Sequence, residues 1–363
     1  MKLIHISDLH IDSKMETNFT PLVAKARNNE ILVTLEKLFS LMETENYHGM
    51  IISGDLFDTK KVSSKAFSYI IDLMRAHTSK HFFYVPGNHD NESLMLRECN
   101  TIPSNLHIFD TTFSQVEIDD VCIGGVQLSS SNCTTFSEQI DFDPEKINIM
   151  LLHGAITKSI SSVSNSSFHL SQVKNKNIDY LALGHIHEYS CGKLDNRGTY
   201  VYSGCLEPRG FDELGPKGFV CVNIDEQAHT INHEFIEFSS RTIHEVQVDI
   251  SNTNSSREIL NKIYSLCSDM PSDDIIKVVL TGTYNTNLIK TPSLIQEELN
   301  GKFYYVKIVD KSKLEIDIKE YENDISLKGC FIRKVLASKL SEKDKAEVIE
   351  TGLKALGGED LLS

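Results

Sequence analysis

The stretch KLIHISDLH, residues 2–10, indicates the fold of this chain, because a short apolar run passes directly into Asp8 and His10. The same pattern returns where apolar runs lead into polar clusters at 54–55, 87–90, 153 and 184–187. Between the first two runs, residues 21–45 carry apolar side chains at helical spacing. This alternation predicts an α/β layer protein. Since ligands bind at the carboxyl ends of strands in such sheets, we expect the polar clusters to meet at one edge.

The composition limits the class of protein. The chain has 363 residues, with 36 Lys and Arg against 51 Asp and Glu, a formal charge of −15 and a pI near 5.4. This charge excludes a basic nucleic-acid coat. The apolar runs are far shorter than the roughly 18–20 residues of a membrane span, and the first residues lack a secretory apolar core. The eight cysteines are dispersed without a CxxC pair. We therefore predict a soluble, cytoplasmic protein with reduced thiols and no membrane partner.

The pattern along the chain predicts three parts. Residues 1–242 form a large α/β domain, with antiparallel hairpins expected within 113–128 and 192–238. Residues 243–320 again alternate strands and helices, which predicts a small α/β capping domain. Residues 321–363 lose strand character and predict two helices, near 325–340 and 342–356. The second has a capping-box start at Ser341 and an apolar stripe (Ala346, Ile349, Leu353 and Leu356).

The polar clusters consist of residues that bind hard or borderline metals. In order they are Asp8-x-His10, Gly54-Asp55-x-x-Asp58, Gly87-Asn88-His89-Asp90, His153 and Gly184-His185-x-His187. Two neighbouring divalent cations need around eight ligand atoms from carboxylates, amide oxygen and imidazole. The glycines beside them permit tight turns and close backbone approach. The set predicts a dinuclear metal centre.

Each cluster alone has a plainer interpretation. Asp-x-His occurs by chance in many chains, and a single histidine such as His153 is more often a hydrogen-bonded core residue than a ligand. The Gly-Asn-His-Asp tetrad at 87–90 is much rarer. Five clusters in one order, all at predicted strand ends, favour the metal centre.

These motifs resemble the calcineurin-like metallophosphoesterase superfamily over residues 8–187, and the runs GDLFDT (54–59) and LGHIH (183–187) resemble its SbcD-type nuclease subunits of DNA double-strand-break repair. The resemblance implies a four-layer αββα sandwich with two divalent ions, usually manganese. It places Asp8, His10, Asp55 and His187 on one ion. It places Asp55, Asn88, His153 and His185 on the other, so that Asp55 bridges them.

The remaining polar residues near these motifs have several possible roles. We predict that His89 is catalytic and donates a proton or hydrogen bond to the leaving oxygen or to the phosphate. Asp90 is a second catalytic candidate that orients the His89 ring, with a turn or helix-capping role as the alternative. Asp58 is expected to support a ligand histidine or a backbone amide. His5 is expected to be a packed core imidazole. For Arg209 and Phe211, contact with the substrate and ordinary salt-bridge and packing roles stay open.

The acidity of the chain argues against unaided DNA binding, because affinity for DNA comes largely from Lys and Arg contacts to phosphates. Positive charge could come from the metal centre or from clusters such as Lys60-Lys61 and 174–176. The resemblance implies a third answer: an SbcC-like coiled-coil ATPase brings DNA-binding surface, and the C-terminal helices dock on it. The alternative is that these helices pack on their own domain. The resemblance also implies a homodimer, with residues 21–45 and the loop before Val62 as candidate interfaces. A small-molecule phosphodiesterase acting on nucleotides or cyclic nucleotides is the alternative function, and a fold that has lost turnover is a third.

Overall fold

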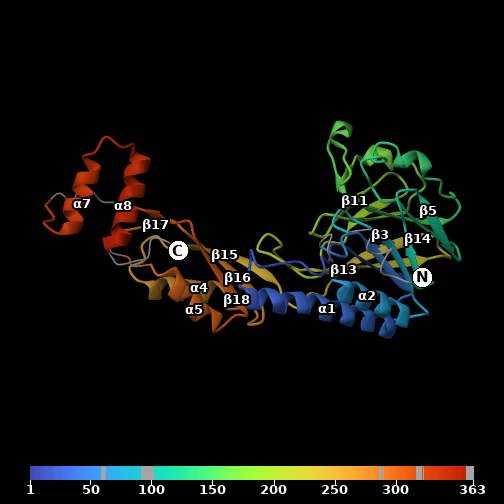
Figure 1. Cartoon of the computed structure of the whole chain (residues 1–363), viewed down its shortest axis with the longest axis horizontal. Helices are drawn as coiled ribbons and strands as arrows, with labels where there is room; N and C mark the ends of the chain where they lie inside the picture. Colours follow the sequence, from blue (N-terminus) through green and yellow to red (C-terminus); the bar gives the residue numbers. More distant parts are fainter. Residues whose placement is uncertain are drawn as a thin grey trace. The chain divides into compact units, whose positions relative to one another are not determined.

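The computed structural model describes residues 1–58, 63–90, 102–285, 288, 290–315, 321 and 323–356 (Figure 1). The chain forms two compact units, Met1–Thr242 and Ile243–Ser363. The predicted interface loop before Val62 and the Lys60-Lys61 cluster lie outside the described residues. Within the described part of the chain, no helix combines the length and the apolar character needed to cross a membrane.

The first unit contains two six-stranded sheets. The first sheet has the order β14-β13-β1-β2-β3-β4, in which β1 to β4 are parallel and β13 and β14 form an antiparallel hairpin. Its strands are β1 (Lys2–Ile6), β2 (Gly49–Ser53), β3 (His81–Val85), β4 (Leu106–Ile108), β13 (Gly218–Asp225) and β14 (Thr230–Glu237). The second hairpin predicted within 192–238 is thus present, whereas the short strand β4 was not anticipated.

The second sheet has the order β11-β12-β10-β7-β6-β5, with four parallel central strands and antiparallel strands at both edges. Its strands are β5 (Ser114–Ile118), β6 (Val121–Gly125), β7 (Ile147–His153), β10 (Tyr180–Gly184), β11 (Ser190–Lys193) and β12 (Thr199–Tyr202). The β5–β6 hairpin confirms the prediction for residues 113–128. All strands that precede predicted ligands are parallel members of these sheets.

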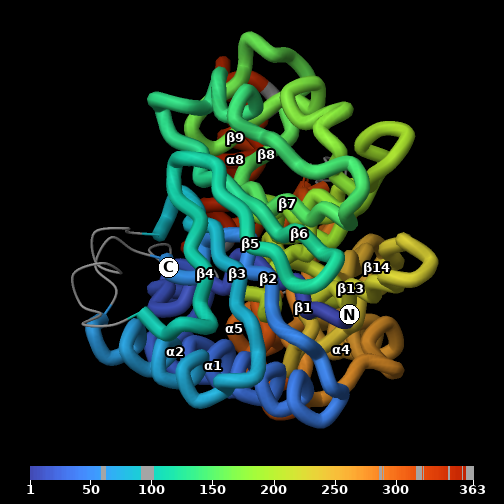
Figure 2. Tube along the Cα trace, turned by 90° about the vertical axis from the view of Figure 1, so that its right-hand side faces the viewer, coloured from blue at the N-terminus to red at the C-terminus, as the bar shows by residue number. Residues whose placement is uncertain are grey.

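The helices and sheets of the first unit lie in layers, with α1 (Pro21–Thr44) and α2 (Ser64–Ala76) on one side of the strands β1 to β4 and β5 to β7 on the other (Figure 2). Apolar residues from the facing sides of both sheets form one buried cluster, which includes Ile51, Phe83 and Ile149. Helices α1 and α2 cover the outer face of the first sheet, where Phe39 of α1 stacks on Phe82 of β3 at 5.4 Å between ring centroids. Burial of apolar side chains at these interfaces stabilises the sandwich.

The outer layer over the second sheet is less regular. In the described chain it consists of the short 3-10 helices η1 (Phe136–Gln139), η2 (Ile160–Ser162) and η3 (Leu170–Gln172) and the two-stranded ribbon β8 (Ala155–Ile156) and β9 (Ser167–Phe168), with loops between them. Phe136 and Phe168 from this layer are fully buried and join a second apolar cluster with side chains of β7 and β10. The four layers follow the expected order, with 3-10 helices and loops in place of α-helices in the outer layer over the second sheet.

The second unit has a three-stranded parallel sheet, β15-β16-β18, and two helices beside it. Its elements are β15 (Ile243–Asp249), α4 (Ser256–Leu266), β16 (Ile275–Thr281), β17 (Thr283–Tyr284), α5 (Pro292–Asn300), β18 (Tyr305–Asp310) and β19 (Lys313–Leu314). The small α/β capping domain over residues 243–320, with its boundary at residue 320, stays a prediction.

Two helices, α7 (Leu327–Leu336) and α8 (Glu342–Leu356), follow in the second unit. Ser341 caps α8 as predicted, because its Oγ accepts the backbone N–H of Asp344. The predicted stripe on α8 is only partly buried: Ile349 packs against Ile332 of α7, whereas Ala346 and Leu356 are exposed. The two helices therefore pack on each other and leave apolar surface uncovered.

Candidate metal centre

All seven predicted metal ligands come together at the carboxyl ends of the parallel strands. They follow β1 (Asp8 and His10), β2 (Asp55), β3 (Asn88) and β10 (His185 and His187), and His153 is the last residue of β7. The loops after β1 and β2 lie side by side, because the backbone N–H of Asp8 donates to Gly54 O at 3.0 Å and that of His10 to Asp55 O at 3.0 Å. Strand topology thus places residues far apart in sequence within one site.

The backbone of the site adopts conformations that L-residues rarely adopt. Asp8, His10, Asp55 and His185 have φ values of 54°, 46°, 49° and 97°. Left-handed conformations cost free energy in non-glycine residues and concentrate at functional sites. Gly54 has φ 87°, and a Cβ there would come within 2.2 Å of His153 Nδ1. Glycine is therefore required between β2 and the Asp55 carboxylate.

One group of predicted ligands consists of Asp8, His10 and His187, whose donor atoms lie close enough together to hold a cation. His187 Nε2 lies 3.7 Å from Asp8 Oδ1, and His10 Nε2 lies 3.9 Å from the same oxygen. His10 Nε2 is buried and has no hydrogen-bond partner among the described residues. A buried polar atom without a partner is costly. A cation between these three side chains would satisfy it.

A second group consists of Asp55, His153 and His185, with Asn88 between the two histidines. Asn88 Oδ1 lies 3.1 Å from His153 Nε2 and 3.2 Å from His185 Nδ1. Asp55 Oδ2 lies 3.3 Å from His153 Nε2 and also 3.6 Å from His10 Nε2 of the first group. Asp55 is therefore the carboxylate that faces both groups.

Three of the histidines are oriented by an oxygen on their Nδ1 side. His10 Nδ1 lies 3.0 Å from Asp58 Oδ1, His153 Nδ1 lies 2.8 Å from Ser53 O, and His187 Nδ1 lies 2.6 Å from Glu213 Oε1. These oxygens can only accept, so Nδ1 carries a hydrogen and Nε2 is the ring nitrogen that faces the carboxylates and would bind a cation in its deprotonated form. The support of His10 by Asp58 confirms one of the two roles expected for that residue.

Sequence reasoning missed Glu213. It lies in the loop after β12, 26 residues beyond His187, and no motif spacing marks it. Burial alone would raise the pKa of Glu213, but the hydrogen bond from His187 and the charge of Arg209 lower it to about 2. Glu213 is thus an ionised carboxylate held inside the protein next to a predicted ligand.

The electrostatics of the second group favour a positive charge between its members. Burial alone would raise the pKa of Asp55, but the hydrogen bond with His153 and the charges of His153 and His10 hold it below its usual value. Burial alone would lower the pKa of His153, yet the interaction with Asp55 raises it to about 9. The raised pKa favours a proton between His153 Nε2 and Asp55. A divalent cation would displace that proton.

His89 and Asp90 occupy different positions. The His89 side chain is 46% exposed, and its ring lies 5.0 Å from that of His10 between centroids. Its backbone N–H donates to Asp55 Oδ1 at 2.9 Å. Asp90 is buried and accepts the backbone N–H groups of Phe57 at 2.9 Å and Gly87 at 2.8 Å. Asp90 therefore fixes the two turns rather than the His89 ring, which is the turn role named as its alternative.

His5 follows the plainer expectation, whereas for Arg209 and Phe211 the structure shows an ion pair and a ring contact and leaves contact with the substrate open. His5 is buried and hydrogen-bonds to Tyr180 Oη at 2.9 Å and Ser53 Oγ at 3.1 Å. Arg209 pairs with Glu213 at 2.9 Å, and Phe211 packs on Phe19 at 5.4 Å between centroids.

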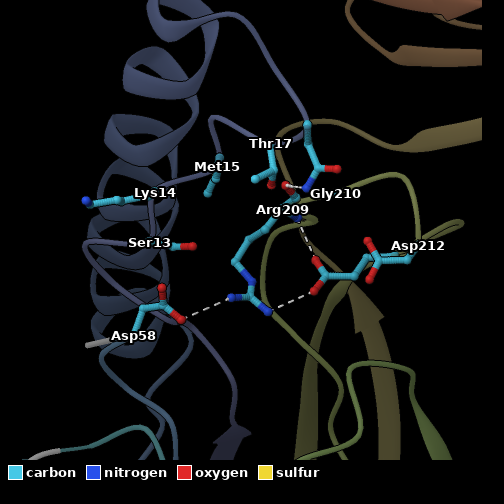
Figure 3. Close-up of a pocket in the computed structure, with 10 residues that line it drawn as sticks. Ser13, Lys14, Met15, Thr17, Asp58, Arg209, Gly210 and Asp212 are labelled. Carbon is cyan, nitrogen blue, oxygen red and sulfur yellow. Dashed lines mark hydrogen bonds and ion pairs between the residues drawn. The ribbon is translucent and has the colours of Figure 1, made fainter. Parts of the chain in front are cut away.

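A pocket of about 280 Å³ adjoins the supports of the first group (Figure 3). Its lining comes from the loops after β1, β2 and β12 (Ser13, Lys14, Met15, Thr17, Asn18, Asp58, Arg209, Gly210, Asp212 and Glu213). Because Asp58 and Glu213 belong both to this lining and to the supports of His10 and His187, a substrate group in the pocket would lie beside the centre.

The donor set fits a pair of divalent cations. Two carboxylates, one amide oxygen and four imidazoles are the mixture that manganese, iron and zinc accept in proteins. The unpartnered His10 Nε2, the position of Asp55 between the groups and the fixed histidine tautomers support the same conclusion.

Comparison with known proteins agrees with this geometry. The profile of the calcineurin-like phosphoesterase family matches residues 1–189, which include all seven predicted ligands. The DNA double-strand break repair protein Mre11 of Sulfolobus acidocaldarius is 22% identical over 396 residues, covering 99% of this chain and 100% of that protein. The SbcD component of the nuclease SbcCD of Staphylococcus saprophyticus is 23% identical, covering 63% of this chain and 67% of that protein. The 3',5'-cyclic adenosine monophosphate phosphodiesterase CpdA of Haemophilus influenzae is 23% identical, covering 52% of this chain and 70% of that protein.

Proposed function

Since the chain belongs to the calcineurin-like phosphoesterase family and is a metal-dependent phosphoester hydrolase, we propose that it is a manganese-dependent DNA nuclease of double-strand-break repair. In this role it would be the nuclease subunit of a complex with an SbcC-like coiled-coil ATPase. The extent of similarity carries the proposal. The match to Mre11 spans 99% of the chain and so includes the second unit, whereas the match to CpdA spans 52%. A phosphodiesterase for small nucleotides has no evident use for the second unit.

The residues of the centre divide into holding and orienting roles. Asp8, His10, Asp55 and His187 would hold one ion, and Asp55, Asn88, His153 and His185 the other. When bound, two divalent ions supply an activated water and neutralise charge on the phosphodiester. Oxygen atoms of Asp58, Ser53 and Glu213 orient three of the histidines so that their Nε2 atoms face the predicted ion positions.

His89 is the group that we propose acts on the substrate directly. Its ring is partly exposed beside the centre, whereas its backbone N–H is used by Asp55. An imidazole at this place can protonate the leaving oxygen or donate a hydrogen bond to the phosphate. Asp90 contributes by fixing the turns that carry Phe57 and Gly87.

The partner proposal addresses the net charge of −15. A chain with this charge gains little from non-specific attraction to DNA, so a second protein is expected to contribute the phosphate contacts. Helices α7 and α8 leave apolar side chains at the surface, with Leu327 72% and Leu356 47% exposed. We propose that these helices bind the coiled coil of the ATPase. A homodimer and a cytoplasmic location remain predictions.

A substrate comparison tests the function. The purified full chain is stripped with chelator, reloaded with manganese and given linear duplex DNA, hairpin DNA and 3',5'-cyclic AMP, with and without the ATPase. Metal-dependent digestion of DNA is expected. The Asp55→Asn variant serves as the inactive control. Hydrolysis of cyclic nucleotide with no digestion of DNA would replace the nuclease proposal with the small-molecule alternative that the similarity to CpdA suggests.

A further inference from the structure

The two halves of the centre are supported in different ways. His153 of the second half is held by a main-chain oxygen, Ser53 O, at the end of strand β2. His10 and His187 of the first half are held by the carboxylates of Asp58 and Glu213. Both carboxylates lie in loops, one after β2 and one after β12. The first half therefore depends on how well two separate loop side chains are fixed.

Arg209 connects these two supports (Figure 3). Its Nη2 lies 2.9 Å from Glu213 Oε1, the oxygen that accepts from His187 Nδ1, and its Nη1 lies 3.8 Å from Asp58 Oδ1. One planar guanidinium thus spans the supports of both histidines in the first half. In Figure 3 the Lys14 side chain points away from this bridge. The donors of an arginine are rigidly spaced, whereas the ammonium of a lysine is a point charge.

The position of Arg209 is itself fixed. Its backbone N–H donates to Glu213 Oε2 at 2.6 Å. The two preceding residues are anchored to helix α1, since Arg27 Nη2 lies 2.9 Å from Glu207 Oε2 and 2.8 Å from Pro208 O. Arg27 and Glu207 are both buried. The loop therefore presents Arg209 from a rigid base.

We propose that Arg209 is a positioning residue for the Asp8–His10–His187 half of the centre, and that the two ion positions consequently differ in their dependence on it. This inference rests on the proposed two-ion centre. The Asp55–His153–His185 half takes its support from Ser53 O, a main-chain atom whose position does not depend on the guanidinium. Loss of the guanidinium should therefore weaken the binding of one ion and leave the affinity for the other unchanged.

The direction in which manganese affinity changes distinguishes positioning by Arg209 from a simple effect of its charge. Removing a positive charge near a cation site reduces repulsion and by itself should make the cation bind more tightly. Releasing Asp58 and Glu213 from their common bridge should disorder His10 and His187 and weaken binding. Loss of a residue that orients metal ligands typically costs about 10–100-fold in metal affinity. Weaker binding on removal of a positive charge would therefore indicate positioning.

The experiment measures manganese binding to the full chain by equilibrium dialysis and calorimetry, without an activity assay. It compares the wild type with Arg209→Met, Arg209→Lys and the control Arg75→Met, which removes an arginine paired with Asp72 on the surface of α2. The wild type and the control should bind two ions. Arg209→Met should keep one ion at wild-type affinity and bind the other about 10–100-fold more weakly. Arg209→Lys should lie between them.

Anomalous diffraction from manganese-soaked crystals of Arg209→Met identifies which ion binds more weakly. The anomalous density should be lost beside Asp8 and kept between His153 and His185. If Arg209→Met bound two ions at unchanged or higher affinity, the inference would be overturned. Loss of the ion between His153 and His185 would overturn it as well. If Arg209→Met fails to fold by circular dichroism, Arg209→Lys decides the matter, because unchanged binding at both positions would contradict it. A wild type that binds no manganese would instead refute the proposed two-ion centre.

Discussion

The His89→Ala substitution separates chemistry from metal binding in this centre. The contact between His89 and Asp55 uses the backbone N–H, at 2.9 Å from Asp55 Oδ1, and an alanine retains it. The imidazole ring, 46% exposed, is removed. The variant should therefore bind the same number of ions as the wild type and lose the proton or hydrogen bond that the ring gives to the substrate.

The size of the loss follows from that role. A positioned general acid contributes typically about 10²–10⁴-fold to the rate, or about 3–5 kcal/mol of barrier. The loss should depend on the leaving group. The 3' or 5' oxygen of a deoxyribose needs a proton as it departs, whereas p-nitrophenolate is stable without one. We expect a large loss of kcat on DNA and a much smaller one on bis(p-nitrophenyl) phosphate.

The assay compares kcat for both substrates at saturating manganese and measures bound metal in the same samples. Equal losses on the two substrates would assign His89 to binding the phosphate rather than to protonating the leaving oxygen. Loss of one ion would refute the reasoning altogether, because His89 also lies near His10 and Asp58 in an arrangement that could hold a metal.

Other substitutions test the surroundings of the centre. Arg27→Met should lower the free energy of unfolding by about 3–5 kcal/mol, because it leaves the Glu207 carboxylate buried without its cation. The double variant Arg27→Met/Glu207→Gln should recover part of this loss. Urea denaturation followed by circular dichroism measures both free energies. Burial lowers the pKa of His5 from 6.5 to about 3. Between pH 6.5 and 3 the unfolded chain therefore binds a proton at His5 and the folded protein does not. The free energy of unfolding should fall on acidification by about 1.4 kcal/mol per pH unit in this range. The His5→Gln variant should show a shallower fall. Removal of residues 325–363 should abolish co-elution with the coiled-coil ATPase and leave hydrolysis of bis(p-nitrophenyl) phosphate intact; unchanged co-elution would assign α7 and α8 a purely structural role.

Much of the centre could be predicted because its ligands follow strands. Apolar runs such as Met50–Ser53 predict strands locally, and parallel strands necessarily bring their carboxyl ends to one edge. Asp55 and Asn88 could therefore be placed together although they are far apart in the sequence. The glycine beside Asp55 indicated a tight turn, and the structure shows the left-handed conformation that requires it.

Apart from Asp58, the supporting side chains could not be predicted in this way. Glu213 and Arg209 lie in an irregular loop whose course depends on the anchoring of Glu207 by Arg27, a contact between residues 180 positions apart. No periodicity or spacing encodes such a contact. For Asp90 the sequence left two roles open, and only the hydrogen bonds to Phe57 and Gly87 distinguish them. The layer over the second sheet was equally out of reach, since short 3-10 helices have no strong sequence period.

Anomalous diffraction from crystals of the wild-type protein soaked in manganese tests the central claim most directly. Two peaks are expected on either side of the Asp55 carboxylate, one within reach of Asp8, His10 and His187 and the other within reach of Asn88, His153 and His185. Manganese found only between Asp58 and His89, or only on one side with Asp55 unligated, would contradict the two-ion centre.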